Sequence, residues 1–387
     1  MEHKFLKKRA DHLIVIQPSS LCNLNCNYCY VPDRLDPTQM SDAIHRDVLY
    51  KLSISPIINT NLEFLWHCGE PLTVGIEFYE RHNQFVSEYL QGKFNVLNHI
   101  QTNAVLINDE WAHFFREHNY MVTVSVDGPA HIHDANRVNW KGKPSHELVM
   151  NGLSILDKYN IPYAAIAVVS EHSLDYPDEI FDFFTSKNFK GVALNAEKME
   201  GANTISSLFG NKQLQPIQKY KHFIKQIYKR WNSYESPFIV REFQGLLSSF
   251  IYKMKHPKST TYNSLIDPFA NITISKTGEV FTFSPEFASG TDDSTNYFSL
   301  GNITNVNTFD EFQDSNKFKY LYQDIMLGVK NCAETCMYFD FCGGGCPSAK
   351  FYENKSLAST STNQCLTQKK IIFETVLNEQ SKSRGMV

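Results

Sequence analysis

The most informative stretch of the chain, residues 13–30, reads LIVIQPSSLCNLNCNYCY. It opens with the apolar run LIVI, which stops just before a proline and predicts a buried strand. Cys22, Cys26 and Cys29 follow within eight residues. Three thiolates leave one iron of a four-iron cluster open, and an open coordination position is where a metal does chemistry. The alternative is a zinc knuckle with a distant fourth ligand, such as Cys68 or a histidine.

Apolar runs and amphipathic stretches alternate after this first strand. Further strands are predicted over residues 62–67, 95–101, 122–126, 164–169 and 192–195. Helices are predicted over residues 42–52, 76–90, 109–118, 147–159 and 178–187, the first with Ser41 as its N-cap. This alternation predicts an α/β fold with a parallel sheet, a partial (β/α)6 barrel of the TIM type. Reactive groups gather at the carboxyl ends of such strands, where the three early cysteines stand.

The remainder of the chain predicts two further parts. Residues 201–265 form a helical connector, with helices over residues 217–231 and 238–255. Residues 266–387 form a small, loop-rich domain that opens with a hairpin, residues 272–274 and 279–283, around Lys276-Thr277-Gly278. The predicted division is therefore a core at 1–200, a connector at 201–265 and a cysteine-bearing domain at 266–387.

Composition excludes several classes of protein. The net charge of −4 gives no reason to expect a nucleic-acid partner. No apolar run reaches ~18 residues, so we expect no membrane span. The start, MEHKFLKKRADHL, is basic but lacks the apolar segment of a secretory signal, so we expect a cytoplasmic protein. The cytosol disfavours disulfides, and the nine cysteines fall mostly into two tight clusters that suggest metal sites.

The spacing CxxxCxYC, with an aromatic residue directly before the third cysteine, resembles the signature of the radical SAM superfamily. Further motifs of that family follow in order. HCGEP at residues 67–71 resembles its GGEP motif, with Cys68 where Gly or Ala is usual; TN ends the third strand; SVDGP at residues 125–129 ends the fourth, and Arg137 follows. Each short motif is weak alone, but this ordered set at successive strand ends argues against the zinc knuckle.

The resemblance implies a [4Fe–4S] cluster bound by Cys22, Cys26 and Cys29, whose open iron chelates S-adenosylmethionine (SAM). The residues that it implies for SAM binding are Gly69, Glu70, Asn103, Ser125, Asp127 and Arg137. A reduced cluster of this kind cleaves SAM, and the resulting 5′-deoxyadenosyl radical removes a hydrogen atom from an unactivated carbon. The cofactor supplies this chemistry and the protein orients it. The expected electron donor is a low-potential carrier such as flavodoxin or ferredoxin.

The second cysteine cluster resembles the SPASM or twitch extension of radical SAM enzymes that modify peptides. The full extension carries two auxiliary clusters, but here the hairpin at residues 278–286 has no thiol. Nine cysteines, less three for the SAM cluster and less Cys68, leave five, whereas two more fully thiolate-ligated cubanes need eight. We therefore expect one auxiliary [4Fe–4S] cluster and an orphan Cys346. The family pattern implies as its ligands Cys332, Cys336, Cys342 and Cys365. A structural zinc on the same four thiolates is the alternative.

Strings along nearly the whole chain resemble maturases that make three-residue cyclophanes in ribosomal peptides, including the darobactin synthase and the Xenorhabdus–Yersinia–Erwinia-type maturases. They lie at residues 14–22, 66–74, 197–203, 282–286 and 342–345. The resemblance implies a carbon–carbon or ether crosslink from an aromatic residue, foremost Trp, to the β-carbon of a residue two positions on. Glu286 is the candidate proton acceptor, because related sulfatase-maturating enzymes carry an acidic residue in the aligned stretch. A solvated turn carboxylate is the alternative interpretation of Glu286.

Other functions stay open at this point. A sulfatase-type maturase would oxidise Ser or Cys to formylglycine, but it normally has the full cysteine set. A thioether-forming maturase would take a Cys-rich peptide. The non-enzyme alternative is an iron–sulfur electron carrier or a zinc-stabilised binding module. Because the first strand begins near residue 13, we expect no N-terminal domain for the leader of the precursor peptide; a separate partner, or a site on the enzyme, would bind it.

Overall fold

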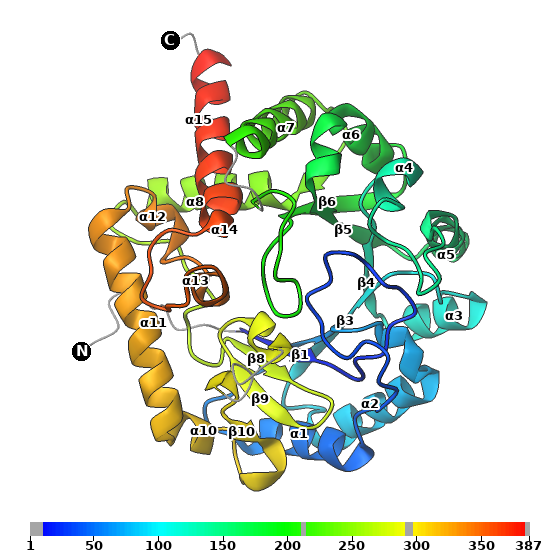
Figure 1. Cartoon of the computed structure of the whole chain (residues 1–387). Coiled ribbons are helices and arrows are strands. Elements are labelled where there is room, and N and C mark those ends of the chain that lie inside the picture. The colour runs from blue at the N-terminus through cyan, green and yellow to red at the C-terminus, as the bar shows by residue number, and fades with distance from the viewer. Residues whose placement is uncertain (1–10, 210–213, 291–296, 384–387) are drawn as a thin grey trace.

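The computed structural model describes residues 11–209, 214–290 and 297–383. The basic start of the chain, on which the secretory-signal argument rests, lies largely outside the described residues. Six parallel strands pair in chain order around a curved sheet (Figure 1). They are β1 (Asp11–Ile16), β2 (Asn61–Trp66), β3 (Asn95–Thr102), β4 (Met121–Ser125), β5 (Tyr163–Val169) and β6 (Phe189–Ala196). The predicted partial (β/α)6 barrel is confirmed.

Helices cover the outer face of this sheet, as Figure 1 shows. They are α1 (Asp42–Ile54), α2 (Ile76–Tyr89), α3 (Asp109–Glu117), α4 (Ala130–His133), α5 (His146–Lys158) and α6 (Pro177–Thr185). Ser41 caps α1 as predicted, since its side chain accepts a hydrogen bond from the backbone N–H of Ile44. Ile14, Val15 and Ile16 are fully buried, because β1 is covered on both faces.

Among the described residues, the sheet extends beyond the six predicted strands to ten and does not close. The predicted hairpin is present as β8 (Asn271–Ile274) and β9 (Glu279–Thr282), but β8 pairs in parallel with β1 and so continues the core sheet. Without β8, one edge of β1 would expose unpaired backbone groups. The short strands β10 (Gly301–Asn302) and β7 (Ile239–Val240) end the sheet. The second connector helix was therefore predicted to start too early, because residues 239–240 form β7.

Helices build most of the connector and the tail. They are α7 (Leu214–Asn232), α8 (Arg241–Lys255), α10 (Asp310–Asp314), α11 (Asn316–Thr335), α12 (Phe339–Cys342), α13 (Pro347–Asn354), α14 (Asn363–Cys365) and α15 (Ile371–Ser383). The tail thus holds more helix than its expected loop-rich character. In Figure 1, α11–α14 lie on the open side of the sheet, between α8 and the β8–β9 hairpin. The boundary at residues 265 and 266 stays a prediction.

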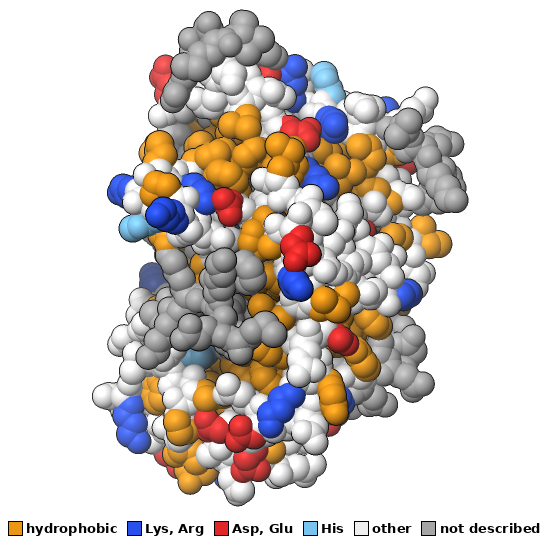
Figure 2. All heavy atoms as spheres, turned by 90° about the vertical axis from the view of Figure 1, so that its left-hand side faces the viewer, with side chains coloured by type: hydrophobic (Ala, Val, Ile, Leu, Met, Phe, Trp, Pro, Cys, Tyr) orange, Lys and Arg blue, Asp and Glu red, His pale blue; other side chains and the backbone are white. Residues whose placement is uncertain are grey.

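Figure 2 shows the face that carries α11, where apolar side chains gather between scattered charges of both signs. Large exposed apolar side chains of this part of the chain are Met254, Tyr320, Leu327 and Met337. No helix among the described residues combines the length and apolar character needed to cross a bilayer.

Candidate active site

A cavity of about 320 Å³ lies at the carboxyl ends of the core strands. Most of the residues that the sequence analysis singled out line it: Cys22, Cys26, Cys29, Gly69, Glu70, Asn103, Ser125, Arg137 and Glu286. Asp127 is not among its lining residues. The structure thus brings together three thiols and the ends of four strands, as a barrel of this type predicts. Their assignment to a cluster and to SAM stays a prediction.

The loop after β1 holds the three thiols in a mostly buried setting. The N–H of Cys22 donates to the carbonyl of Arg34 at 2.9 Å, and the N–H of Leu24 donates to the Cys22 sulfur at 3.5 Å. Burial raises the pKa of Cys22 to about 12 and that of Cys26 to about 11. Both thiols therefore keep their protons until a metal displaces them. Three soft sulfur donors on one cavity fit an iron–sulfur cluster.

Gly69 and Glu70 shape the end of β2. Gly69 has φ +94°, and a Cβ there would lie 2.6 Å from the carbonyl oxygen of Ser19. Glu70 is buried and accepts hydrogen bonds from Thr102 Oγ1 and the N–H of Asn103, both at 2.7 Å. Burial raises the pKa of Glu70 to about 7. Glu70 thus fastens the turn after β2 to the end of β3.

Asp127 positions Arg137 from behind the cavity wall. Arg137 Nη2 lies 3.0 Å from Asp127 Oδ1, and Tyr28 donates a short hydrogen bond to the same carboxylate. The guanidinium also lies over the Tyr28 ring, 5.3 Å from its centroid. Arg137 Nε is buried and has no partner among the described residues. A carboxylate bound in the cavity, such as that of SAM, would satisfy this donor.

Four tail thiols lie around a second small cavity. Cys332 lies in the last turn of α11 and Cys336 directly follows that helix, Cys342 ends α12 and Cys365 ends α14. Burial first, and the neighbouring Cys342 second, raise the pKa of Cys365 to about 11. No three His, Cys, Asp or Glu side chains in the described part of the chain are arranged to hold a metal ion as they stand. Four thiols around one cavity nevertheless form a donor set that suits a four-iron cluster.

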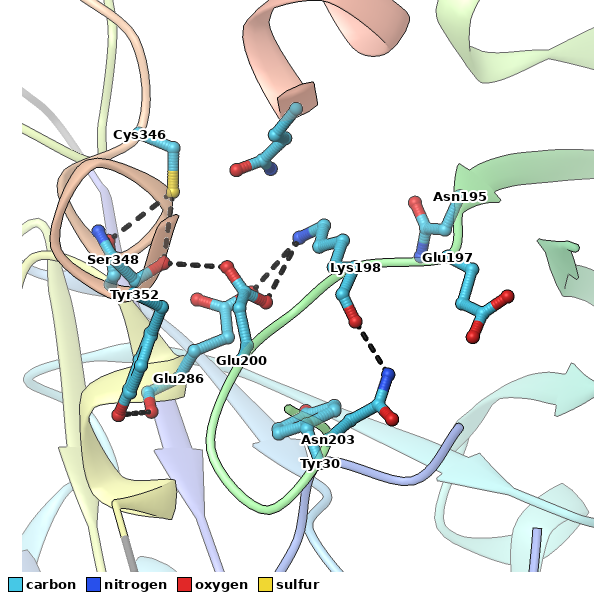
Figure 3. A network of polar contacts seen from close by, with 12 residues as sticks. Tyr30, Asn195, Glu197, Lys198, Glu200, Asn203, Glu286, Cys346, Ser348 and Tyr352 are labelled. Carbon is cyan, nitrogen blue, oxygen red and sulfur yellow. Dashed lines mark hydrogen bonds and ion pairs between the residues drawn. The ribbon is translucent and has the colours of Figure 1, made fainter. Parts of the chain in front are cut away.

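Cys346 also borders the small cavity, but its sulfur belongs to a polar network that Figure 3 shows. Its Sγ lies 3.1 Å from Ser348 Oγ and 3.7 Å from Ser284 Oγ. Ser348 donates to Glu200 Oε1 at 3.0 Å. Lys198 Nζ lies 3.5 Å from both Glu200 Oε2 and Glu286 Oε1. That Cys346 binds no cluster stays a prediction.

A third cavity, of about 540 Å³, joins these two regions. It is lined by Cys342, Cys346 and Cys365 on one side. On the other side it shares four lining residues with the cavity of the early cysteines: Asn195, Lys198, Arg241 and Glu286. A chain of cavities thus leads from the first cysteine cluster to the second, with these four side chains at the junction.

The sequence analysis did not identify Asn195, Lys198 or Arg241 as site residues. The available signal was the charged string EKME at residues 197–200, directly after the sixth strand. The loop after β6 reaches the junction because Gly201 has φ +52° and leaves no room for a side chain. A Cβ there would lie 2.4 Å from the Tyr30 carbonyl oxygen and 2.5 Å from that of Ser289. The loop is therefore wedged between the early cysteine loop and the tail.

Comparisons with known proteins agree with this architecture. A family model described as the radical SAM superfamily matches residues 16–184. An uncharacterized protein of Synechocystis is 38% identical over 97% of this chain and 93% of its own length. A cysteine-type anaerobic sulfatase-maturating enzyme of Clostridium novyi is 28% identical over 86% of this chain and 87% of its own. A solved structure of native anSMEcpe with bound AdoMet and the Cp18Cys peptide has a TM-score of 0.77 at 24% identity, covering 96% of this chain and 98% of that one, which supports the fold.

Proposed function

Because the chain belongs to the radical SAM superfamily, we propose that it is a peptide maturase that crosslinks an aromatic residue, foremost Trp, to the β-carbon of a residue two positions on. The crosslink is a carbon–carbon or an ether bond in a ribosomally made precursor peptide. A flavodoxin or ferredoxin serves as the electron donor, and the reaction takes place in the cytoplasm.

Two sets of thiols divide the work in this proposal. Cys22, Cys26 and Cys29 hold the cluster that binds SAM, and together with SAM that cluster supplies a radical able to abstract hydrogen from carbon. Arg137 orients the SAM carboxylate with its free Nε, and Asp127 holds the guanidinium in place. The tail set holds an auxiliary cluster that supplies a one-electron acceptor; its ligands are Cys332, Cys336, Cys342 and Cys365.

The observation that carries the proposal is the position of Glu286 between the two sets of thiols. An arene that gains a bond to carbon regains its aromaticity by losing one electron and one proton. Glu286 lines both cavities at their junction, and its Oε2 is buried with no partner among the described residues. An unpaired buried carboxylate oxygen is costly unless a donor reaches it. The substrate ring supplies that donor when it gives up its proton.

A second candidate is a sulfatase-type maturase that makes formylglycine. The similarity to the Clostridium novyi enzyme over most of both chains favours it. Against it stands the thiol count, since the hairpin stretch VFTFSPE at residues 280–286 carries no cysteine. Oxidation of Ser or Cys also removes one proton and one electron from a carbon radical, so Glu286 would serve either reaction. The product therefore has to discriminate between them.

Co-expression with the cognate precursor peptide tests the proposal. The product should be lighter by two hydrogen atoms per crosslink, and tandem mass spectrometry should find no backbone cleavage inside the bridged tripeptide. Formylglycine would instead appear as an aldehyde that reacts with a hydrazine probe. Detection of that aldehyde, or of a Cys thioether, would overturn the crosslinking assignment.

Glu286→Gln tests the proton acceptor within the same experiment. We expect it to lower crosslinking by at least about 100-fold, the usual worth of a general base, while 5′-deoxyadenosine still forms. Glu279→Gln is the matched control, because Glu279 lies on the same hairpin and bonds instead to Ser299 and Asn302. An equal loss in both variants would point to a disturbed hairpin.

A further inference from the structure

Two carboxylates share one ammonium at the junction of the cavities (Figure 3). Lys198 Nζ lies 3.5 Å from one oxygen of Glu200 and 3.5 Å from one oxygen of Glu286. The side chain of Glu200 is only 3% exposed, whereas that of Glu286 is 19% exposed and that of Lys198 23%. If both carboxylates were ionised, this buried group would carry an uncompensated negative charge, which is costly away from water.

The surroundings of Glu200 suit a proton better than those of Glu286 do. Glu200 is the more buried carboxylate, and burial penalises the charged form. Its Oε1 lies 3.0 Å from Ser348 Oγ, and a hydroxyl can donate to an ionised carboxylate or accept from a protonated one. Ser348 in turn lies 3.1 Å from the Cys346 thiol, another group that both donates and accepts. Glu286 has no such two-way partner at its side-chain oxygens among the described residues.

We propose that Glu200 carries a proton up to about neutral pH and acts as a positioning residue for Glu286. As a neutral group it leaves the charge of Lys198 to Glu286, which this ion pair fixes at the junction. This inference rests on the proposed role of Glu286 as proton acceptor and names the residue that positions Glu286 for that role.

Electrostatics support the assignment. Burial is the largest cause that raises the pKa of Glu200, to about 7; Lys198 lowers it and Glu286 raises it. The cluster faces few other titratable groups from the elements around it. Among the described residues they are Tyr30 of the early cysteine loop, His67 and Cys68 after β2, Cys346 before α13, Tyr352 and Glu353 of α13, and Arg241 of α8. Burial keeps the thiols of Cys68 and Cys346 neutral and lowers the pKa of His67 to about 4. Arg241 is paired with Glu242, so Lys198 is the cation that the two carboxylates share.

Infrared difference spectroscopy of the holoenzyme without peptide tests the proton directly. Spectra are compared between about pH 6 and about pH 8, which bracket the raised pKa. We expect a protonated-carboxyl band that fades as the pH rises and that is missing in Glu200→Gln. In Glu286→Gln the band should remain but fade at lower pH, because the charge of Glu286 raises the pKa of Glu200. Differences between variants separate Glu200 from other buried carboxyls such as Glu70. A band that persists in Glu200→Gln and vanishes in Glu286→Gln would overturn the proposal, as would the absence of any change in both.

Lys198 gives the test a second arm with a different readout. In Lys198→Met, Glu200 loses the cation that lowers its pKa, so the infrared band should persist to higher pH. The acid limb of the crosslinking rate should also move to higher pH, by about one unit, the usual size of a shift from one nearby charge. Lys198→Arg should restore both. A uniform loss of rate at every pH, with no shift of the limb, would mean that Lys198 only supports the fold. The infrared arm needs no substrate, so it can fail or succeed whatever product the enzyme makes.

Discussion

Gly69 occupies a place that no other residue fits. Its φ of +94° favours glycine, and an added Cβ would meet the Ser19 carbonyl oxygen at 2.6 Å. We expect Gly69→Ala to destabilise the protein by about 2 kcal/mol or more, since both backbone strain and a backbone clash result. It should also lower the yield of 5′-deoxyadenosine, because the turn that it displaces borders the cavity of the early cysteines. Thermal unfolding and product analysis check the two effects.

Gly92 provides the matched control for that substitution. It has φ +75°, but no atom lies within 4 Å of a Cβ built on it. Gly92→Ala should therefore cost only the strain of the left-handed conformation, about 1 kcal/mol, and leave SAM cleavage intact. Equal effects of the two substitutions would show that the close approach to Ser19 is unimportant.

Cys346 is the tail cysteine that we expect to bind no cluster. Its sulfur contacts the hydroxyls of Ser284 and Ser348. Cys346→Ala should leave the iron content unchanged at about eight atoms per chain, four for each cubane. Iron and sulfide analysis of the anaerobically reconstituted protein measures this. About twelve irons in the wild type, or the loss of four in Cys346→Ala, would mean that a second auxiliary cluster exists and that the ligand assignment of the tail is wrong.

At the scale of elements, α1 and α2 meet through a buried pair of histidines. His45 Nε2 lies 3.0 Å from His82 Nδ1, and His82 Nε2 lies 3.1 Å from Asn98 Oδ1. Both rings are fully buried. Burial lowers the pKa of His45 to about 3 and that of His82 well below its ordinary value. In the unfolded chain both titrate near about pH 6.5.

The sign of the resulting pH dependence follows from linkage. Above about pH 6.5 both states are neutral at these positions, so the stability is fully present. Below about pH 6.5 the two histidines bind protons in the unfolded chain but not in the folded protein. The free energy of unfolding therefore falls as the pH drops towards the pKa of these histidines in the folded protein. Between about pH 7 and pH 5 we expect a loss of about 2 kcal/mol per histidine. Melting temperatures of wild type, His45→Gln and His82→Gln over this range check the slope, which should be shallower in both variants. The exposed His172→Gln should match the wild type.

Local patterns predicted the elements whose signal is local. The alternation of apolar runs and amphipathic stretches gave the six core strands and the five long helices between them, and the turn Lys276-Thr277-Gly278 gave the hairpin. The pairing of β8 with β1 was not predictable, because it joins segments more than 250 residues apart and depends on which edge is left open. Helix α11 was missed although its buried positions follow helical spacing. They are Phe318, Leu321, Ile325, Val329 and Cys332.

At the scale of the whole molecule, some residues of the candidate site could be predicted from local sequence and others could not. Its cysteines and the residues implied for SAM came from motifs that each lie within one strand end, so the sequence alone could name them. The junction residues could not be named so readily. Glu286 was named from a resemblance, but Lys198 and Arg241 come from the loop after β6 and from α8, and only the folded chain brings them to Glu286. Asp127 was expected to bind SAM, but it contacts Arg137 and does not line the cavity. A sequence motif cannot distinguish a residue that lines a cavity from one that supports it.

The two thiol sets should be separable by substitution. In a triple variant with Ala at Cys22, Cys26 and Cys29, conversion of SAM to 5′-deoxyadenosine should vanish while the fold survives. The cysteine loop is held by backbone bonds that the substitutions leave in place: Cys22 N–H to Arg34, Asn25 N–H to Val138 and Asn27 N–H to Asn136. Chromatography of dithionite-reduced reactions and thermal unfolding measure the two properties. Normal turnover in the triple variant would refute the assignment of the first site.

Substitution of a cluster cysteine in the tail should affect folding, in contrast to the triple variant of the first site, because these cysteines connect separate short helices. Cys332 on α11, Cys336 directly after α11, Cys342 on α12 and Cys365 on α14 come together around one cavity. Metal binding in such segments is coupled to folding. Cys365→Ala should therefore lower the melting temperature by several degrees and abolish crosslinking. SAM cleavage without crosslinking should persist, since the core sheet and the early cysteine loop carry their own contacts. Cys346→Ala, in the same tail, is the control that should keep the melting temperature of the wild type. If Cys365→Ala crosslinked normally, the second site would have no part in the reaction, and an electron acceptor outside the chain would be required.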